Sequence, residues 1–174
     1  RFILFYMPQS HGSSIYYTIS EDLLSWSDPL LLLESYRTVI KDKEVQIRYV
    51  NMDAAVLPDG DLLGVCQFWC REHYRAQLGT GIVTLRSSDN GKTWTSPQVI
   101  YEGSNWEPYL LVLPDGKIHC YFTDSTPETW NSGVSLMVSE DNGRSWSPKM
   151  RVCRSYKYEY DKETTLDKSI YTDQ

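Results

Sequence analysis

Residues 87–97 read Ser-Ser-Asp-Asn-Gly-Lys-Thr-Trp-Thr-Ser-Pro, and residues 139–148 repeat the pattern as Ser-Glu-Asp-Asn-Gly-Arg-Ser-Trp-Ser-Pro. A third copy, at residues 20–29, has one residue fewer between its first Ser and its Trp and lacks the Gly. An Asp side chain can accept hydrogen bonds from its own turn, and a Gly two residues later permits a positive φ. The motif therefore predicts a tight turn between two strands, in which Asp89, Asp141 and the Trp side chains are structural rather than catalytic.

A second motif indicates that the chain is built from repeats. Leu-Pro-Asp-Gly begins at Leu57 and again at Leu113, an offset of 56 residues, whereas Trp94 and Trp146 are offset by 52. The difference falls in a polar loop, where length is free to vary. Each full unit then holds four short β-rich runs separated by turn residues, which is typical of a four-stranded antiparallel meander.

The motif Ser-x-Asp-x-Gly-x-Thr/Ser-Trp is the Asp-box, and through it the chain resembles the sialidase-like Asp-box, or BNR-repeat, β-propellers. The resemblance implies an all-β fold with four-stranded antiparallel blades, usually six to a ring. Because such blades take about 40–55 residues, 174 residues predict a partial propeller of about three blades. The structural Asp-box residues are then Ser87, Asp89, Gly91, Trp94, Ser139, Asp141, Gly143 and Trp146.

We expect a single propeller fragment over residues 1–174. Its parts are a partial blade at 1–30, blades at 45–97 and 105–150, and the start of another blade at 151–174. The chain begins at Arg1, inside an apolar segment, so we expect the natural N-terminus to lie further upstream. The compartment stays open, with secretion and the periplasm as candidates.

Composition narrows the class of protein and its partners. The chain is 41% hydrophobic and 23% charged, which is typical of a folded protein rather than a disordered or collagen-like one. Its 17 basic and 23 acidic residues give a formal charge of -6, and no basic stripe could follow a phosphate backbone. No apolar run approaches the ~18 residues that cross a bilayer. Neither nucleic acid nor membrane is expected as a partner.

The cysteines and histidines predict no metal site and no cofactor. Cys66, Cys70, Cys120 and Cys153 lack the CxxC spacing of zinc knuckles or redox pairs, and no two His have metal-ligand spacing. Cys66 and Cys70 fall in one expected strand, where four residues span about 13 Å, too far for a disulfide. We therefore expect structural thiols.

Meander topology places the candidate site at one end of the blades. The Leu-Pro-Asp-Gly turns and the Asp-boxes share one end, so the starts of the inner strands and the ends of the second strands share the other. Carboxylates, arginines and aromatic rings gather there, a mixture that suits a sugar. The residues expected at that end are Gln9, His11, Arg48, Asn51, Asp53, Trp69, Arg71, Glu72, His73, Tyr74, Arg75, Trp106, Glu107, Asp124, Glu128 and Trp130.

Glu107 is the candidate catalytic residue, because it lies between Trp106 and Pro108 at the start of an inner strand. That setting should partly desolvate the carboxyl group and raise its pKa toward that of a general acid. A surface or salt-bridged Glu is the alternative. The candidate substrate-binding residues are Trp106, Asp124, Asn51, Arg48, Arg71 and His73, each of which has a strand-end or solvated-loop role as its alternative.

The resemblance also bears on the reaction. Sialidases carry their first arginine as Arg-Ile-Pro, but Trp106 and Val50 occupy the matching positions here, so that arginine is not visible. The run Trp106–Leu110, followed by Leu-Pro-Asp-Gly and by Tyr-Phe-Thr-Asp at residues 121–124, is more similar to exo-α-L-arabinanases. In that family the corresponding Glu is the acid/base, which implies this role for Glu107. We expect the second carboxylate of a glycosidase beyond Gln174.

The sequence thus favours an exo-acting glycoside hydrolase of the sialidase or exo-arabinanase type, which cleaves a terminal sugar by carboxylate acid/base catalysis. The alternative is a non-catalytic Asp-box propeller that binds glycans or proteins, since the fold does not fix the chemistry. Other propeller enzymes, such as lyases, also remain. The identity of the sugar, the stereochemical outcome and the oligomeric state are left open.

Overall fold

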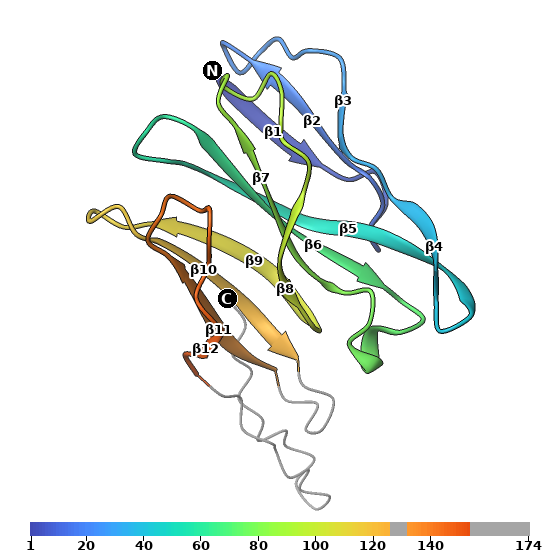
Figure 1. Cartoon of the computed structure of the whole chain (residues 1–174). Coiled ribbons are helices and arrows are strands. Elements are labelled where there is room, and N and C mark those ends of the chain that lie inside the picture. The colour runs from blue at the N-terminus through green and yellow to red at the C-terminus, as the bar shows by residue number, and fades with distance from the viewer. Residues whose placement is uncertain (126–131, 154–174) are drawn as a thin grey trace, which may run out of the picture.

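The computed structural model describes residues 1–125 and 132–153, whose strands form three antiparallel sheets that follow one another along the chain (Figure 1). The first sheet contains β1 (Phe2–Tyr6), β2 (Ile15–Ser20) and β3 (Leu30–Leu33). The second contains β4 (Tyr36–Ile40), β5 (Lys43–Val56), β6 (Leu62–Cys70), β7 (Gly81–Ser87) and β8 (Gln98–Glu102). The third contains β9 (Asn105–Val112), β10 (Ile118–Ser125), β11 (Ser132–Ser139) and β12 (Met150–Arg151).

The two repeat units become the second and third sheets. In each, Leu-Pro-Asp-Gly joins the first two strands of the unit and the Asp-box joins the last two, as the turn chemistry predicts. The first sheet has the degenerate Asp-box between β2 and β3, so its three strands correspond to the second, third and fourth strands of a unit. The prediction of an all-β partial propeller is confirmed.

One strand was not expected from the sequence. β4 adds a fifth strand to the second sheet, pairing with the start of β5 from Tyr36 opposite Ile47 to Ile40 opposite Lys43. The two-residue turn between them, Lys41 and Asp42, has φ values of 48° and 60°. Two successive positive φ values are the signature of the type I′ turn that closes tight hairpins.

The two Leu-Pro-Asp-Gly turns close in the same way. Gly60 N donates to Leu57 O at 2.9 Å, and Gly116 N donates to Leu113 O at 2.9 Å. In the first turn Asp59 Oδ1 accepts a hydrogen bond from Asp61 N at 3.1 Å, and the second turn repeats this contact one unit later. Turns and Asp-boxes therefore mark one edge of the blades, called the Asp-box end below.

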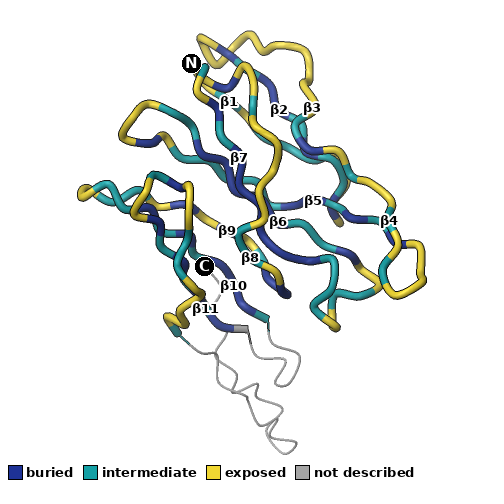
Figure 2. Tube along the Cα trace, viewed as in Figure 1, coloured by how far each residue is buried: buried dark blue, intermediate teal, exposed yellow. Residues whose placement is uncertain are grey.

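Apolar side chains between successive sheets hold the blades together, and burial is concentrated along the strands (Figure 2). Leu63 and Val65 of β6 pack with Phe122 of β10 between the second and third sheets, all at most 2% exposed. Ile15 of β2 and Cys66 of β6 belong to the cluster between the first and second sheets. Burying one such side chain contributes about 1.5–3 kcal/mol, so each inter-sheet layer is a major source of stability.

The cysteines have the structural setting that the sequence predicts. Cys66 and Cys70 lie on the same strand, and all four thiols are free, with Cys66, Cys70 and Cys120 buried. Burial raises the pKa of the Cys66 and Cys120 thiols, which keeps them protonated and unreactive. Across residues 1–125 and 132–153, the structure has no helix that is long and apolar enough to span a membrane.

Candidate functional site

The Asp-boxes are closed loops whose polar atoms bond one another. Ser87 Oγ donates to Asp89 Oδ1 at 2.8 Å, and the same Asp89 oxygen accepts from Thr93 N at 2.9 Å while Oδ2 accepts from Thr93 Oγ1 at 2.6 Å. Asp141 repeats this set with Ser139 and Ser145. Hydrogen bonds from the Thr93 and Ser145 side chains and backbones lower the pKa of each Asp to about 2.

The glycine and the tryptophan of each Asp-box attach its blade to the preceding sheet. Gly91 and Gly143 have φ values of 81° and 80°, and a Cβ on Gly143 would lie 2.7 Å from Leu63 Cδ2 of the second sheet. The Trp94 ring lies 5.8 Å from that of Phe5 of β1, and Trp146 packs on the cluster that contains Leu63. These side chains are thus engaged in blade packing.

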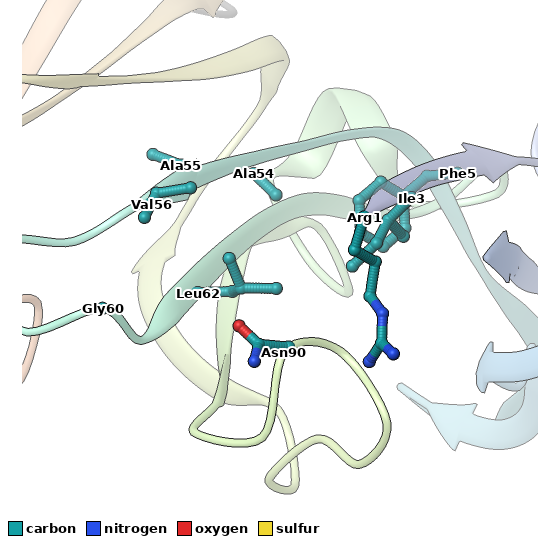
Figure 3. Close-up of a pocket in the computed structure, with 9 residues that line it drawn as sticks. All are labelled: Arg1, Ile3, Phe5, Ala54, Ala55, Val56, Gly60, Leu62 and Asn90. Atoms are coloured by element: carbon teal, nitrogen blue, oxygen red, sulfur yellow. The ribbon is translucent and has the colours of Figure 1, made fainter. Parts of the chain in front are cut away.

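Cavities also lie at the Asp-box end. The one drawn in Figure 3 has a volume of about 370 Å³ and lies between β1, β5 and the turn before β6. Its lining is Arg1, Ile3, Phe5, Ala54, Ala55, Val56, Gly60, Leu62 and Asn90. Gly60 belongs to a Leu-Pro-Asp-Gly turn and Asn90 to an Asp-box, so this cavity is on the side away from the candidate residues. No carboxylate lines it.

Toward the opposite end, the backbone has an unusual feature at equivalent positions of the two units. Asn51 lies in the middle of β5 and not near its start, where the sequence predicted it, because this strand begins at Lys43. Asn51 in β5 and Glu107 in β9, offset by 56 residues, both have a φ of 53°. The β5–β6 register shifts between Val50 and Asp53, and the β9–β10 register shifts at the matching place. Each inner strand therefore bulges where its candidate residue lies. Left-handed non-glycine residues and bulges concentrate at ligand sites and active sites.

Three aromatic rings gather beside the Glu107 bulge. Trp106 precedes Glu107, and its ring centroid lies 5.3 Å from that of Tyr74 and 5.8 Å from that of Trp69. Trp69 is the residue before the last of β6, while Tyr74 begins η1 (Tyr74–Ala76) in the loop after it. Two sheets therefore supply this aromatic cluster, formed by Trp69, Tyr74 and Trp106, and all three rings are half-buried. Partly exposed aromatic rings are the usual stacking surface for a sugar.

Glu107 itself differs from the expectation in one respect. Its side chain is exposed, so the described residues do not provide the desolvation that the neighbouring Trp106 and Pro108 suggested. The cause is the strand's geometry: Glu107, Tyr109 and Leu111 alternate on the face of β9 turned away from the second sheet, and all three are exposed. The equivalent residues of β5, from Asn51 onward, are half-buried because β9 packs against that strand.

Asp124 is not placed as an open sugar ligand. Its side chain is 2% exposed, and its Oδ2 atom lies 2.8 Å from Lys149 Nζ and 3.2 Å from Arg151 Nη2. Ser135 Oγ donates to the same oxygen at 3.2 Å. Burial alone would lower the pKa of Lys149, but its hydrogen bonds and charge interactions with Asp124 and Tyr101 outweigh burial and raise it. Asp124 therefore joins the outer strand β12 to the sheet.

The arginine and histidine candidates lie on and after the strands that carry the aromatic cluster. Arg48 is directly opposite Trp69 in the β5–β6 register, and its Nη2 donates to Gln46 Oε1 at 3.2 Å. Arg48 Nη1 and His73 Nε2 are enclosed by protein and have no hydrogen-bond partner in the part of the chain that the structure describes. Arg71 is exposed in the loop after β6. Of this group, Arg71 is thus the one most open to a ligand.

The remaining expected residues lie in a loop, outside the described residues, or in contact with the backbone of the next blade. Gln9 and His11 are exposed in the loop between β1 and β2, and Glu128 and Trp130 lie outside the described residues. Asp53 Oδ2 accepts a hydrogen bond from Leu110 N at 2.9 Å, so this carboxylate is engaged with the next blade. No group of three or more His, Cys, Asp or Glu side chains within residues 1–125 and 132–153 could hold a metal ion.

Gln67 contacts the backbone near Glu107, although it was not among the residues predicted from the sequence. It is fully buried, and its Nε2 donates to Asn105 O at 2.6 Å, reaching from β6 to the residue two before Glu107. Tyr74 Oη donates to the same carbonyl oxygen at 3.2 Å. A Gln in the middle of an otherwise apolar strand was the available signal, because a buried amide requires partners.

Comparisons with known proteins agree with this architecture. Residues 79–160 match the family profile of the BNR repeat-like domain. A Dyadobacter fermentans protein of unknown function has a similar structure, with a TM-score of 0.59 and 18% identity over 90% of this chain and 48% of its own. No curated protein matches the sequence significantly.

Two further solved structures are similar at 14% identity over 83% of this chain. The Hadza microbial sialidase Hz136 has a TM-score of 0.58 and is covered over 32% of its length, and a PL25 ulvan lyase has a TM-score of 0.57 and is covered over 39%. This chain therefore spans less than half of each of the three structures. At these identities the likeness shows the fold, and with the repeat match it confirms the resemblance to the sialidase-like BNR-repeat superfamily.

Proposed function

We propose that the chain forms part of a carbohydrate-active propeller whose ligand binds at the end opposite the Asp-boxes. The observation that carries this proposal is the left-handed bulge at Glu107, with a φ of 53°, next to the aromatic cluster of Trp69, Tyr74 and Trp106. A strained carboxylate beside stacking surfaces suits a sugar ring and its hydroxyl groups. Two similar structures are a sialidase and an ulvan lyase bound to a glucuronate–sulfated rhamnose unit, which supports carbohydrate as the ligand class.

The reaction we propose is exo-acting glycoside hydrolysis with Glu107 as acid/base. Its carboxyl group would protonate the leaving glycosidic oxygen of a sugar bound at the bulge. A second carboxylate is needed, about 5–5.5 Å away for retention or 6.5–9.5 Å for inversion. Asp124 is bound to two cations and Asp53 to a backbone N–H, so we assign that role to a residue beyond those described.

A non-catalytic glycan-binding propeller is the second candidate. The exposed side chain of Glu107 favours it, because an open carboxylate can accept hydrogen bonds from sugar hydroxyl groups without taking part in a reaction. The two candidates differ in what the carboxylate does. A glycosidase needs the ionisable group for turnover, whereas a binding protein needs only its hydrogen-bonding capacity.

The test is Glu107→Gln in the full-length protein that carries this sequence, assayed on chromogenic α-L-arabinosides, sialosides and other glycosides. Glu102→Gln, which changes another exposed strand Glu, is the matched control. We expect turnover by the parent protein and by the control, and a loss of at least 100-fold with Glu107→Gln, in line with the usual contribution of a general acid. Equal turnover in all three proteins would exclude Glu107, and turnover in none would favour the binding propeller.

A further inference from the structure

The backbone at Glu107 is strained, and the surroundings must hold it there. A left-handed φ is unfavourable for any residue with a Cβ, and the residue before a proline is restricted further. Glu107 has a φ of 53° and precedes Pro108, whereas its repeat equivalent is Asn51, a residue type that adopts this conformation more readily. Such strain persists only where neighbouring contacts impose the conformation.

One such contact lies downstream of the bulge. Asp53 Oδ2 accepts a hydrogen bond at 2.9 Å from Leu110 N, three residues after Glu107. This bond runs from β5 of the second sheet to β9, the inner strand of the third. It fixes the backbone on the C-terminal side of the bulge, and because the acceptor is a carboxylate it is stronger than a neutral hydrogen bond.

The other contacts lie upstream. Asn105 O, two residues before Glu107, accepts hydrogen bonds from Gln67 Nε2 at 2.6 Å and from Tyr74 Oη at 3.2 Å. The loop that carries Tyr74 is itself tied down, since Ser104 Oγ donates to Tyr74 O at 2.6 Å. Burial raises the pKa of Tyr74 to about 12, so its hydroxyl group stays a donor at all physiological pH values.

We infer that Asp53, Gln67 and Tyr74 are positioning residues that hold the left-handed bulge of Glu107 from the preceding blade. The Glu107 side chain is therefore oriented by the second sheet, although it belongs to the third. Only the catalytic meaning of this clamp rests on the proposed function, because the clamp itself is a property of the backbone. These three side chains form one unit that acts on both flanks of the bulge.

The clamp is tested by a double-mutant cycle read out as urea unfolding. Glu107→Gly removes the strain, so we expect it to raise the folding equilibrium constant about threefold in the parent. In the Asp53→Ala background the released backbone can relax, and the same substitution should then lower that constant about twofold. Asp53→Asn keeps an acceptor oxygen for Leu110 N and should restore the gain. Glu102→Gly, at an ordinary strand position, should lower the constant in both backgrounds.

An unchanged effect of Glu107→Gly in the two backgrounds would overturn the clamp. If Asp53→Ala does not fold, Tyr74→Phe replaces it, because it removes a single hydroxyl group and leaves the ring in the aromatic cluster. On a substrate that the parent turns over, Tyr74→Phe should lower kcat about tenfold with KM little changed. If the effect of Glu107→Gly differs between the two backgrounds but the parent turns over no glycoside, the clamp stands and the glycosidase proposal is rejected. The unfolding cycle and the turnover assay therefore test the two proposals separately.

Discussion

The two ends of the blades differ in how their carboxylate groups are satisfied. At the Asp-box end, the Asp carboxylates bond their own loops: Asp89 and Asp141 use both carboxylate oxygens within five residues of themselves. At the other end, Glu107 is exposed on a left-handed bulge beside half-buried aromatic rings. The carboxylates of the first end are satisfied within their own loops, whereas the backbone at the second end is held by side chains from another blade. The second end is therefore the one to which we assign ligand recognition in our proposal.

The largest expected effect tests how tightly the Asp-box end is closed. Gly143→Ala places a Cβ 2.7 Å from Leu63 Cδ2 at a φ of 80°, so strain and overpacking add to about 3 kcal/mol of lost stability. Gly116→Ala is the matched control, because its φ is 86° but a Cβ there meets nothing within 4 Å. It should cost about 1 kcal/mol. Urea denaturation measures both, and equal losses would show that the loop is not packed on the preceding blade.

A smaller effect is expected where charge is buried at the outer strand. Asp124→Asn leaves Lys149 and Arg151 without their counter-charge and should cost about 2 kcal/mol, less than for a fully buried pair because both cations are partly exposed. Glu140→Gln breaks the exposed pair with Lys117, at 2.9 Å, and should cost under about 1 kcal/mol. Thermal unfolding of both variants is the comparison. If Asp124→Asn costs no more stability than Glu140→Gln, Asp124 is not held by Lys149 and Arg151 and again becomes a candidate ligand residue.

The smallest effect concerns pH at the Asp-box end. Asp89 and Asp141 have a pKa of about 2 in the folded chain against an ordinary value of 3.8, so they contribute stability above pH 4 that is lost as the pH falls through 2. We expect Asp89→Asn combined with Asp141→Asn to flatten the dependence of the unfolding midpoint on pH between 4 and 2. An unchanged slope in this variant would show that the Asp-box carboxylates are not bonded in solution as they are here.

Much of the fold could be predicted because its signals are local and repeated. The Asp-boxes and the Leu-Pro-Asp-Gly turns each form their hydrogen bonds within a few residues, so the motif contains nearly all the information needed to place it. β4 was missed because residues 36–40 have no counterpart in the other unit, although their β-rich pattern and the following Lys-Asp turn were visible. A comparison between repeat units cannot predict a strand that occurs in only one of them.

The site could be predicted only in outline. Topology brought Trp69, Tyr74, Trp106 and Glu107 to the same end, since strand starts and ends alternate in a meander. The bulge at Glu107 and the pairing of Asp124 could not be foreseen, because they depend on contacts from residues 25 or more positions away. The prediction that Glu107 is partly buried was wrong for the same reason. Its burial depends on contacts with a neighbouring blade and not on Trp106 and Pro108 alone.

The most direct test of a carbohydrate site at the bulge end is a ¹⁹F NMR titration of the full-length protein labelled with 5-fluorotryptophan. The titrant is the oligosaccharide that binds most tightly on a glycan array. The two ends of the blades carry different tryptophans, Trp69 and Trp106 at one and Trp94 and Trp146 at the other. We predict that the resonances of Trp69 and Trp106 shift on saturation while those of Trp94 and Trp146 do not. Shifts confined to Trp94 or Trp146, or no sugar-dependent shift at all, would contradict the assignment.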